Sequence, residues 1–202
     1  MAIAAVLLAA GESTRMGGLK ALLEWEGKPL VRYQAETLLA APVERVLVVL
    51  GHRAAELAPL LPSLPRLLTV HNSDYAAGKV RSIVTGVRAV DPSDDVLVLG
   101  VDQPRPAGLI ARVCAGHTGA ITVAGYQGRR GHPAIFAPAL RGELLALDEA
   151  TEGLRAVLRA HANDVRVIET GDPLALVNLN TPEDYAAALR LSSTSSARAG
   201  NQ

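Results

Sequence analysis

The sequence predicts an α/β protein, with a three-layer α/β/α sandwich around a Rossmann-like, mostly parallel sheet. Runs rich in Val and Leu lack polar alternation, which is typical of strands that are covered on both faces. Between these runs, apolar residues recur at helical spacing, so strand and helix alternate along the chain. The expected strands of the first part occupy residues 2–8, 45–50, 67–70, 95–101 and 120–124.

The expected helices follow from apolar residues that fall on one helical face. One pattern contains Val31, Ala35, Leu38 and Leu39, and another contains Val80, Ile83, Val84 and Val87. In the second half the alternation loosens. A Gly-rich stretch at 125–131 leads into an apolar run at 133–136, followed by helix candidates at 138–147 and 152–160 and a strand at 165–169.

A last helix is expected from Pro182 to about Leu191. The residues after it are small and polar and offer almost nothing to bury, so residues 192–202 are expected to form a disordered tail. At 202 residues, the rest of the chain is the size of one domain, and no internal repeat or linker divides it. We therefore expect a single domain over residues 1–191.

Composition excludes several classes of function. Lys plus Arg and Asp plus Glu each number 20, so no net charge draws the molecule to nucleic acid or to an anionic membrane. No apolar run approaches the roughly 18 residues of a membrane span. The apolar N-terminal stretch has no basic segment ahead of it, so a strand is favoured over a signal peptide. With Cys114 as the lone cysteine, a disulfide framework is excluded and a cytoplasmic location is expected.

The segment after the first strand, LAAGESTRMGGLK at residues 8–20, has the composition of a phosphate-binding loop. Small residues let backbone amides approach an anion, and Arg15 and Lys20 can neutralise it. It is neither a Walker loop, because Leu19 separates Gly18 from Lys20, nor a GxGxxG turn, because residue 13 is Ser. The alternative is a strand-to-helix turn with solvated basic side chains.

The run DVLVLGVDQP at residues 95–104 is a buried-type strand that ends in an acid. Ligands of open α/β sheets bind beyond the carboxyl ends of strands, where Asp102 is expected. Mg²⁺ prefers one or two carboxylates together with phosphate oxygens and water, so Asp102 is a candidate magnesium ligand. The alternative role for Asp102 is an Asx turn ahead of Pro104.

Two later segments contain polar residues of interest. Thr181 and Pro182 have the form of a helix start, an N-cap followed by Pro at the first helical position. Lys79 and Arg81 lie at an expected helix N-terminus, where two cations oppose the helix dipole. Our hypothesis is that they bind an anion there, a substrate phosphate. Judged alone, His132 in GRRGHPAIF is a turn residue beside solvated arginines.

These segments, in this order, resemble the MobA-like nucleotidyltransferases, and the form LAAG is similar to the molybdenum cofactor cytidylyltransferases. The resemblance spans about the first 190 residues and implies a fold of the nucleotide-diphospho-sugar transferase type. It implies catalytic roles for Arg15, Lys20 and Asp102, with Mg²⁺ on Asp102 and Asn180. The nucleotide-binding residues that it implies are Leu8, Ala9, Ala10, Gly11, Ser13, Arg15, Lys20, Asn72, Gly78 and Ser82. The acceptor side would comprise Gln103, Pro104 and His132, and our hypothesis adds Lys79 and Arg81, which replace residues that are usually uncharged in the family.

The activity implied by the resemblance is transfer of CMP from CTP to the molybdenum–molybdopterin cofactor, with release of pyrophosphate. An apo-molybdoenzyme of the xanthine dehydrogenase type would receive the product. Asn178 and Asn180 depart from this pattern, because the cytidylyltransferases usually have acids there. Asn at these positions is nearer the guanylyltransferases, so GTP is the alternative donor. Two further alternatives are a nucleotide-binding oxidoreductase that uses NAD(P)H and a carrier that holds the finished cofactor.

Overall fold

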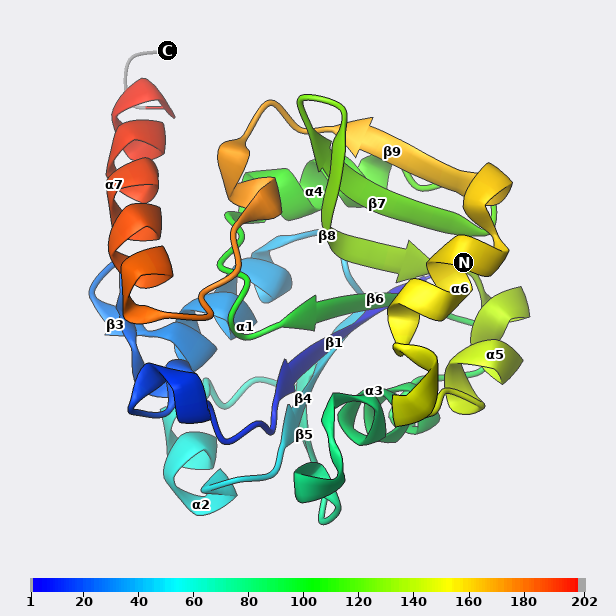
Figure 1. The fold of residues 1–202 in the computed structure, drawn as a ribbon, viewed down its shortest axis with the longest axis horizontal. Coiled ribbons are helices and arrows are strands. Elements are labelled where there is room, and N and C mark those ends of the chain that lie inside the picture. The colour runs from blue at the N-terminus through cyan, green and yellow to red at the C-terminus, as the bar shows by residue number, and fades with distance from the viewer. Residues whose placement is uncertain (1, 200–202) are drawn as a thin grey trace.

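The computed structural model describes residues 2–199, apart from the side chains of residues 15, 151 and 193–199. In this part of the chain, seven strands form one sheet in the order β5-β4-β1-β6-β8-β7-β9 (Figure 1). β8 is antiparallel to both of its neighbours, and the other pairs are parallel. The strands are β1 Ile3–Ala9, β4 Arg45–Leu50, β5 Leu67–His71, β6 Asp95–Gly100, β7 Ile121–Tyr126, β8 Arg129–Phe136 and β9 Val165–Glu169. The expected mostly parallel sheet is confirmed.

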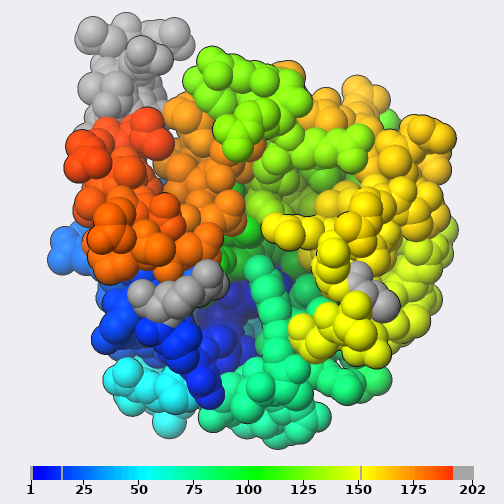
Figure 2. Space-filling view, viewed as in Figure 1, coloured from blue at the N-terminus to red at the C-terminus, as the bar shows by residue number. Residues whose placement is uncertain are grey.

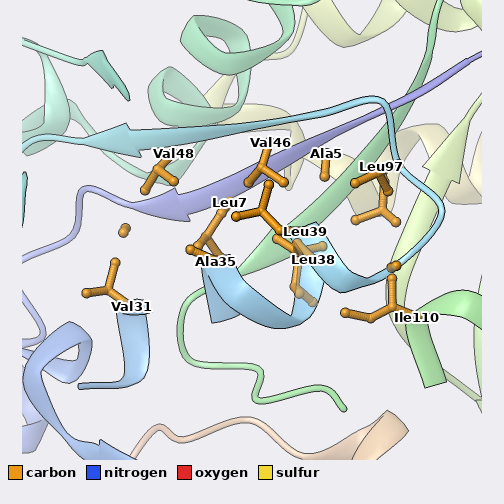
Figure 3. Packing of buried hydrophobic residues seen from close by; sticks show 14 of the residues in the cluster. Ala5, Leu7, Val31, Ala35, Leu38, Leu39, Val46, Val48, Leu97 and Ile110 are labelled. Carbon is orange, nitrogen blue, oxygen red and sulfur yellow. The ribbon is translucent and has the colours of Figure 1, made fainter. Parts of the chain in front are cut away.

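Helices cover both faces of the sheet, as Figure 1 shows. On one face lie α1 (Leu30–Ala40), α2 (Ala54–Leu57) and α4 (Ala107–Ala115). On the other lie α3 (Lys79–Ala89), α5 (Arg141–Leu145) and α6 (Leu154–Ala160). Because side chains alternate along a strand, β1 directs Ala5 and Leu7 toward the first layer and Val6 toward the second. Figure 3 shows the first layer, where α1 packs on β1 and β4.

A smaller apolar cluster joins residues 25–33 to residues 174–188. The short hairpin of β2 (Glu24–Trp25) and β3 (Lys28–Pro29) lies beside α7 (Pro182–Ala199) in Figure 1. The cluster consists of Trp25, Leu30, Tyr33, Leu174, Leu179 and Ala188. α7 extends beyond Leu191, where the sequence analysis ends it, whereas residues 200–202 lie outside the described part. The single domain and the disordered tail stay predictions.

The topology places the functional loops at one edge of the sheet. β1, β4 and β6 are parallel neighbours, so the segments that follow them emerge on the same side. These segments include the phosphate loop after β1 and the acidic turn after β6. None of the helices within residues 2–199 is long and apolar enough to span a membrane.

Candidate active site

A pocket of about 330 Å³ opens at the carboxyl ends of β1 and β6. In Figure 2, the blue N-terminal loop and the green segment near residue 80 stand on either side of a hollow in this face. The pocket brings together the two segments that the sequence analysis assigned to the nucleotide and the acid assigned to the metal. Its lining residues are Leu8, Ala10, Gly11, Glu12, Ser13, Thr14, Lys20, Tyr75, Ala76, Gly78, Lys79, Ser82, Gly100, Val101 and Asp102.

The phosphate loop is held in shape by its own hydrogen bonds. Ser13 adopts a left-handed conformation, with φ of 59°, and its Oγ accepts a hydrogen bond of 3.1 Å from the backbone N–H of Lys20. The Ser13 carbonyl accepts from the N–H of Met16 at 2.9 Å, which closes the single turn Thr14–Met16. The loop therefore curls around the pocket instead of continuing as a helix. The side chain of Arg15 lies outside the described part of the structure, so its catalytic role stays a prediction.

Lys20 is the centre of the site. Its side chain is nearly buried, with the residue only 8% exposed. The Nζ atom lies 3.2 Å from Oδ2 of Asp102 and 3.3 Å from Oδ1 of Asn180. These partners are 82 and 160 residues away in the sequence, so the fold gathers three predicted site residues around one point.

The acidic turn after β6 does not depend on an Asx turn. Gln103 closes it, because the backbone N–H of Gln103 donates to the Gly100 carbonyl at 3.0 Å and Gln103 Oε1 accepts from the Gly100 N–H at 2.9 Å. Among the described residues, the hydrogen-bond partner of the Asp102 carboxylate is Lys20. The turn therefore leaves Asp102 directed at the pocket, and the Asx-turn alternative is not found.

Asp102 and Asn180 together fit a divalent cation. Both direct an oxygen at the same positively charged atom, Lys20 Nζ, so their oxygens already converge where a cation is stabilised. A carboxylate and an amide oxygen are ligands that Mg²⁺ and Mn²⁺ accept, provided that phosphate oxygens and water complete the shell. Within the described residues, no group of three or more His, Cys, Asp or Glu side chains could hold a metal ion.

The segment that enters α3 forms the opposite wall. Asn72 and Ser82 are both buried, and Asn72 Nδ2 donates to Ser82 Oγ at 3.0 Å. Asn72 Oδ1 also accepts from the N–H of Asp74 at 3.0 Å, which fixes the turn. Ser82 and Gly78 line the pocket, whereas Asn72 supports them from behind. All three were predicted to bind nucleotide.

An acid of the chain itself occupies the N-terminus of α3. The Glu149 carboxylate accepts a 2.5 Å hydrogen bond from the N–H of Val80, and a Cβ at Gly78 would lie 2.3 Å from its carboxyl carbon. The negative charge of Glu149 thus partly offsets the unfavourable interaction of Lys79 and Arg81 with the positive end of the helix dipole. Lys79 lines the pocket, but exposed Arg81 is not among the lining residues. Binding of a substrate phosphate by these two cations stays a prediction.

The acceptor-side predictions fall on a second group of residues. Gln103 and Pro104 are buried in the turn, and Gln103 Nε2 donates to Asn178 Oδ1 at 2.8 Å. His132 precedes Pro133 in a cis peptide at the middle of β8. Burial, followed by the positive charge of Arg105, lowers the pKa of His132 to about 4, so its imidazole is neutral at pH 7. None of the three lines the pocket.

Sequence reasoning missed two buried polar residues behind the site. Gln34 of α1 and Arg105 are both 0% exposed. The signals were present: Gln34 interrupts an apolar helical face, and Arg105 stands between Pro104 and Pro106 in an otherwise apolar region. Neither signal specifies a partner, because those partners are backbone carbonyls from distant segments.

A phosphate-type loop facing an acid at the carboxyl edge of a mostly parallel sheet defines a nucleotidyltransferase fold and site. The comparison with protein families agrees: the MobA-like NTP transferase domain matches residues 5–165. The chain belongs to this family. The resemblance of the sequence to MobA-like nucleotidyltransferases is thereby confirmed.

Relatives with different activities match most of the chain. Nicotine blue oxidoreductase from Paenarthrobacter nicotinovorans is 32% identical, covering 90% of this chain and 93% of the relative. The molybdenum cofactor guanylyltransferase of Ectopseudomonas mendocina is 32% identical, covering 91% of this chain and 90% of the relative. The molybdenum cofactor cytidylyltransferase of Escherichia coli is 24% identical, covering 93% of this chain and 95% of the relative. Overall similarity therefore does not select a base.

Solved structures show the same fold. A nucleotidyl transferase from Methanothermobacter superposes with a TM-score of 0.81 at 25% identity, covering 96% of this chain and 99% of that one. A Mycobacterium tuberculosis protein in complex with manganese superposes with a TM-score of 0.75 at 22% identity, covering 94% and 99%. The expected fold of the nucleotide-diphospho-sugar transferase type is confirmed.

Proposed function

We propose that the protein transfers a nucleoside monophosphate from a nucleoside triphosphate to a phosphorylated acceptor, with CTP as donor and the molybdenum–molybdopterin cofactor as acceptor. The observation that supports this most directly is the convergence of Lys20, Asp102 and Asn180 beside the phosphate loop. Ala10, Gln103 and the Gly131-His132-Pro133 sequence favour CTP, although the structure places that sequence in strand β8 and not in the turn that was expected. Asn178 and Asn180 keep GTP as the alternative.

The residues present suggest how transfer would proceed. An oxygen of the acceptor phosphate attacks the α-phosphorus in line, a new phosphoanhydride bond forms, and the bond to pyrophosphate breaks. Lys20, held at the loop's end, neutralises charge that builds up on the α-phosphate oxygens. Asp102 and Asn180 would hold a divalent metal, which supplies further charge neutralisation when it is bound. No side chain has to act as a covalent nucleophile.

A second candidate is an oxidoreductase, and the match to nicotine blue oxidoreductase over 90% of this chain favours it. In that case the same pocket would hold a nicotinamide nucleotide. The missing GxGxxG turn counts against a Rossmann mode of dinucleotide binding. The two candidates differ in product: one releases pyrophosphate and the other consumes NAD(P)H.

The test is pyrophosphate release in the presence of Mg²⁺ and each of CTP, GTP, ATP and UTP, with and without molybdenum-loaded molybdopterin. Release that depends on the acceptor with CTP alone supports the proposal, and release with GTP alone replaces it by guanylyl transfer. Silence with all four, together with NADPH oxidation by an electron acceptor, supports the oxidoreductase. Silence with tight binding of the finished nucleotide cofactor supports a carrier.

A matched pair of variants ties the activity to the site. Asp102→Asn keeps the shape of the side chain and removes its charge, so it should abolish metal-dependent release. Asp91→Asn makes the same change at an exposed turn, where the side chain accepts a hydrogen bond from the N–H of Ser93. It should leave release unchanged. Equal activity of both variants would show that the negative charge of Asp102 is not needed for metal-dependent release.

A further inference from the structure

Arg105 is a buried cation, and among the described residues no carboxylate forms an ion pair with its guanidinium. The residue is 0% exposed, and its side-chain hydrogen bonds go to backbone carbonyls. Burial lowers its pKa to about 9, so it is still charged at neutral pH. Burying such a charge is costly unless its N–H groups are satisfied. The folded structure therefore retains Arg105 although burying its charge costs free energy.

The four hydrogen bonds join three separate segments of the site. Arg105 Nε donates to the His132 carbonyl at 2.9 Å, and Nη1 donates to the Pro104 carbonyl at 3.0 Å. Nη2 donates to the carbonyls of Ala175 at 3.0 Å and Val177 at 2.8 Å. The acceptors other than Pro104 are 27, 70 and 72 residues away in the sequence. A planar guanidinium holds such partners in a fixed geometry.

The backbone of Arg105 is fixed as firmly as its side chain. Its N–H donates to Oε1 of buried Gln34 at 3.0 Å, and Gln34 Nε2 donates to the Gln103 carbonyl at 2.5 Å. Gln34 lies on α1 in the middle of the chain's first core layer. The acidic turn that contains Asp102 is thus tied to a rigid helix.

The segment that Arg105 holds leads directly to the second oxygen ligand. The carbonyl of Val177 accepts a hydrogen bond from Arg105. The next residue, Asn178, accepts a hydrogen bond from the side chain of Gln103. The N–H of Leu179 then donates to the Asp102 carbonyl at 2.8 Å. Asn180 comes next and reaches Lys20. The segment at Ala175 packs closely against β8, because a Cβ at Gly131 would lie only 2.1 Å from the Ala175 carbonyl oxygen.

We infer that Arg105 is a positioning residue that sets the spacing between Asp102 and Asn180, and hence the affinity of the site for a divalent cation with a nucleotide. This inference rests on the proposed function. Arg105 forms no hydrogen bond with the side chains of Asp102 and Asn180 in the described structure. Its effect reaches these two residues through the backbone segments beside them.

The test compares Arg105→Met, which removes every donor, with Arg105→Lys, which keeps the charge and three donors. Arg66→Met is the matched control, because Arg66 also donates to two carbonyls, those of Val43 and Leu39 at 3.0 Å, outside the pocket. The measurements are the melting temperature, the dissociation constant of Mn²⁺ in the presence of CTP or GTP by electron paramagnetic resonance, and kcat and KM for pyrophosphate release.

We expect Arg105→Met to weaken Mn²⁺ binding by about 10- to 100-fold well below its melting temperature, with Arg105→Lys intermediate. Arg66→Met should lower the melting temperature and leave Mn²⁺ binding unchanged. A folded Arg105→Met variant with wild-type Mn²⁺ affinity would overturn the inference. If that variant does not fold, Arg105→Lys decides, and affinity equal to that of Arg66→Met overturns it.

Failure of the proposed function has a different signature. Wild-type protein that binds no Mn²⁺–nucleotide and releases no pyrophosphate refutes both the proposed function and the inference. Wild-type activity combined with an Arg105→Met variant that is equally active and binds Mn²⁺ equally well refutes the inference alone.

Discussion

Lys20 has a structural role, and under the proposed function it also has a catalytic one, and both depend on the Nζ atom. In the described structure, its ammonium group is the partner of Asp102 and Asn180, and it therefore offsets the charge of Asp102 at the pocket floor. A nucleotide with a divalent metal would bring new partners for all three side chains. The ammonium group would then be available to the α-phosphate, where a buried charge acts more strongly than in water.

Lys20→Ala should therefore lower kcat for pyrophosphate release by about 100-fold or more, with little change in stability, because Asp102 can regain water through the open pocket. Steady-state kinetics and a thermal melt check both statements. Lys28→Ala is the control, because Lys28 forms an ion pair on the protein surface, with its Nζ atom 2.5 Å from Oε2 of Glu36. Near-normal turnover of Lys20→Ala would contradict the assigned role.

Among the elements, α7 shows how a helix start and a ligand position are coupled. Thr181 Oγ1 accepts from the N–H of Asp184 at 3.2 Å, which confirms the predicted N-cap. Asp184 Oδ2 in turn accepts from the N–H groups of Asn180 at 3.1 Å and Thr181 at 3.0 Å. This reciprocal arrangement is a capping box with Asp in the acidic position, and it holds the backbone of Asn180.

We expect Asp184→Ala to lower the free energy of unfolding by about 1 kcal/mol and to raise the metal concentration needed for half-maximal activity. Urea denaturation and a metal titration measure the two effects. Glu183→Ala removes a neighbouring acid of the same first turn, which is exposed, and therefore controls for the helix dipole. Equal losses in the two variants would argue against the capping box.

At the scale of the whole molecule, one buried and one exposed helix glycine, Gly86 and Gly108, differ in the space that a side chain would find. α3 approaches β1 and β4 closely at Gly86, where a Cβ would lie 2.3 Å from Val6 Cγ1 and 3.0 Å from Val49 Cγ2. α4 has an open position at Gly108, where a Cβ would meet nothing within 4 Å. α3 also contributes Lys79 and Ser82 to the wall of the pocket.

Gly86→Ala should lower the free energy of unfolding by about 1–3 kcal/mol, because stiff valine side chains must move and the gain in helix propensity is smaller. Gly108→Ala makes the same change in open space and should be neutral or stabilising by up to about 1 kcal/mol. Chemical denaturation of both variants gives the comparison. A Gly86→Ala variant as stable as wild type would show that moving the two valine side chains costs no more than the gain in helix propensity.

Much of the fold followed from local patterns. Continuous apolar runs predicted strands that lie within one or two residues of those observed for β1, β4, β6 and β7, because burial on both faces leaves a strong signature. The half-exposed edge strands β5 and β9 also lie within one residue of their predicted positions. The hairpin of β2 and β3 and helix α4 were missed. The hairpin strands are two residues long, and what stabilises them is packing against α7, which no local pattern records.

The sequence alone was sufficient for the class of fold and for the position of the predicted phosphate loop and of Asp102 at the carboxyl edge of the sheet, since each depends on residue types that lie close together in the chain. The tertiary structure decided which of the candidates meet. It placed Asn180 at Lys20, put Glu149 on the end of α3, and kept Arg81 out of the pocket lining. It also revealed Arg105, because a buried cation bound to distant carbonyls depends on contacts formed only when the chain folds.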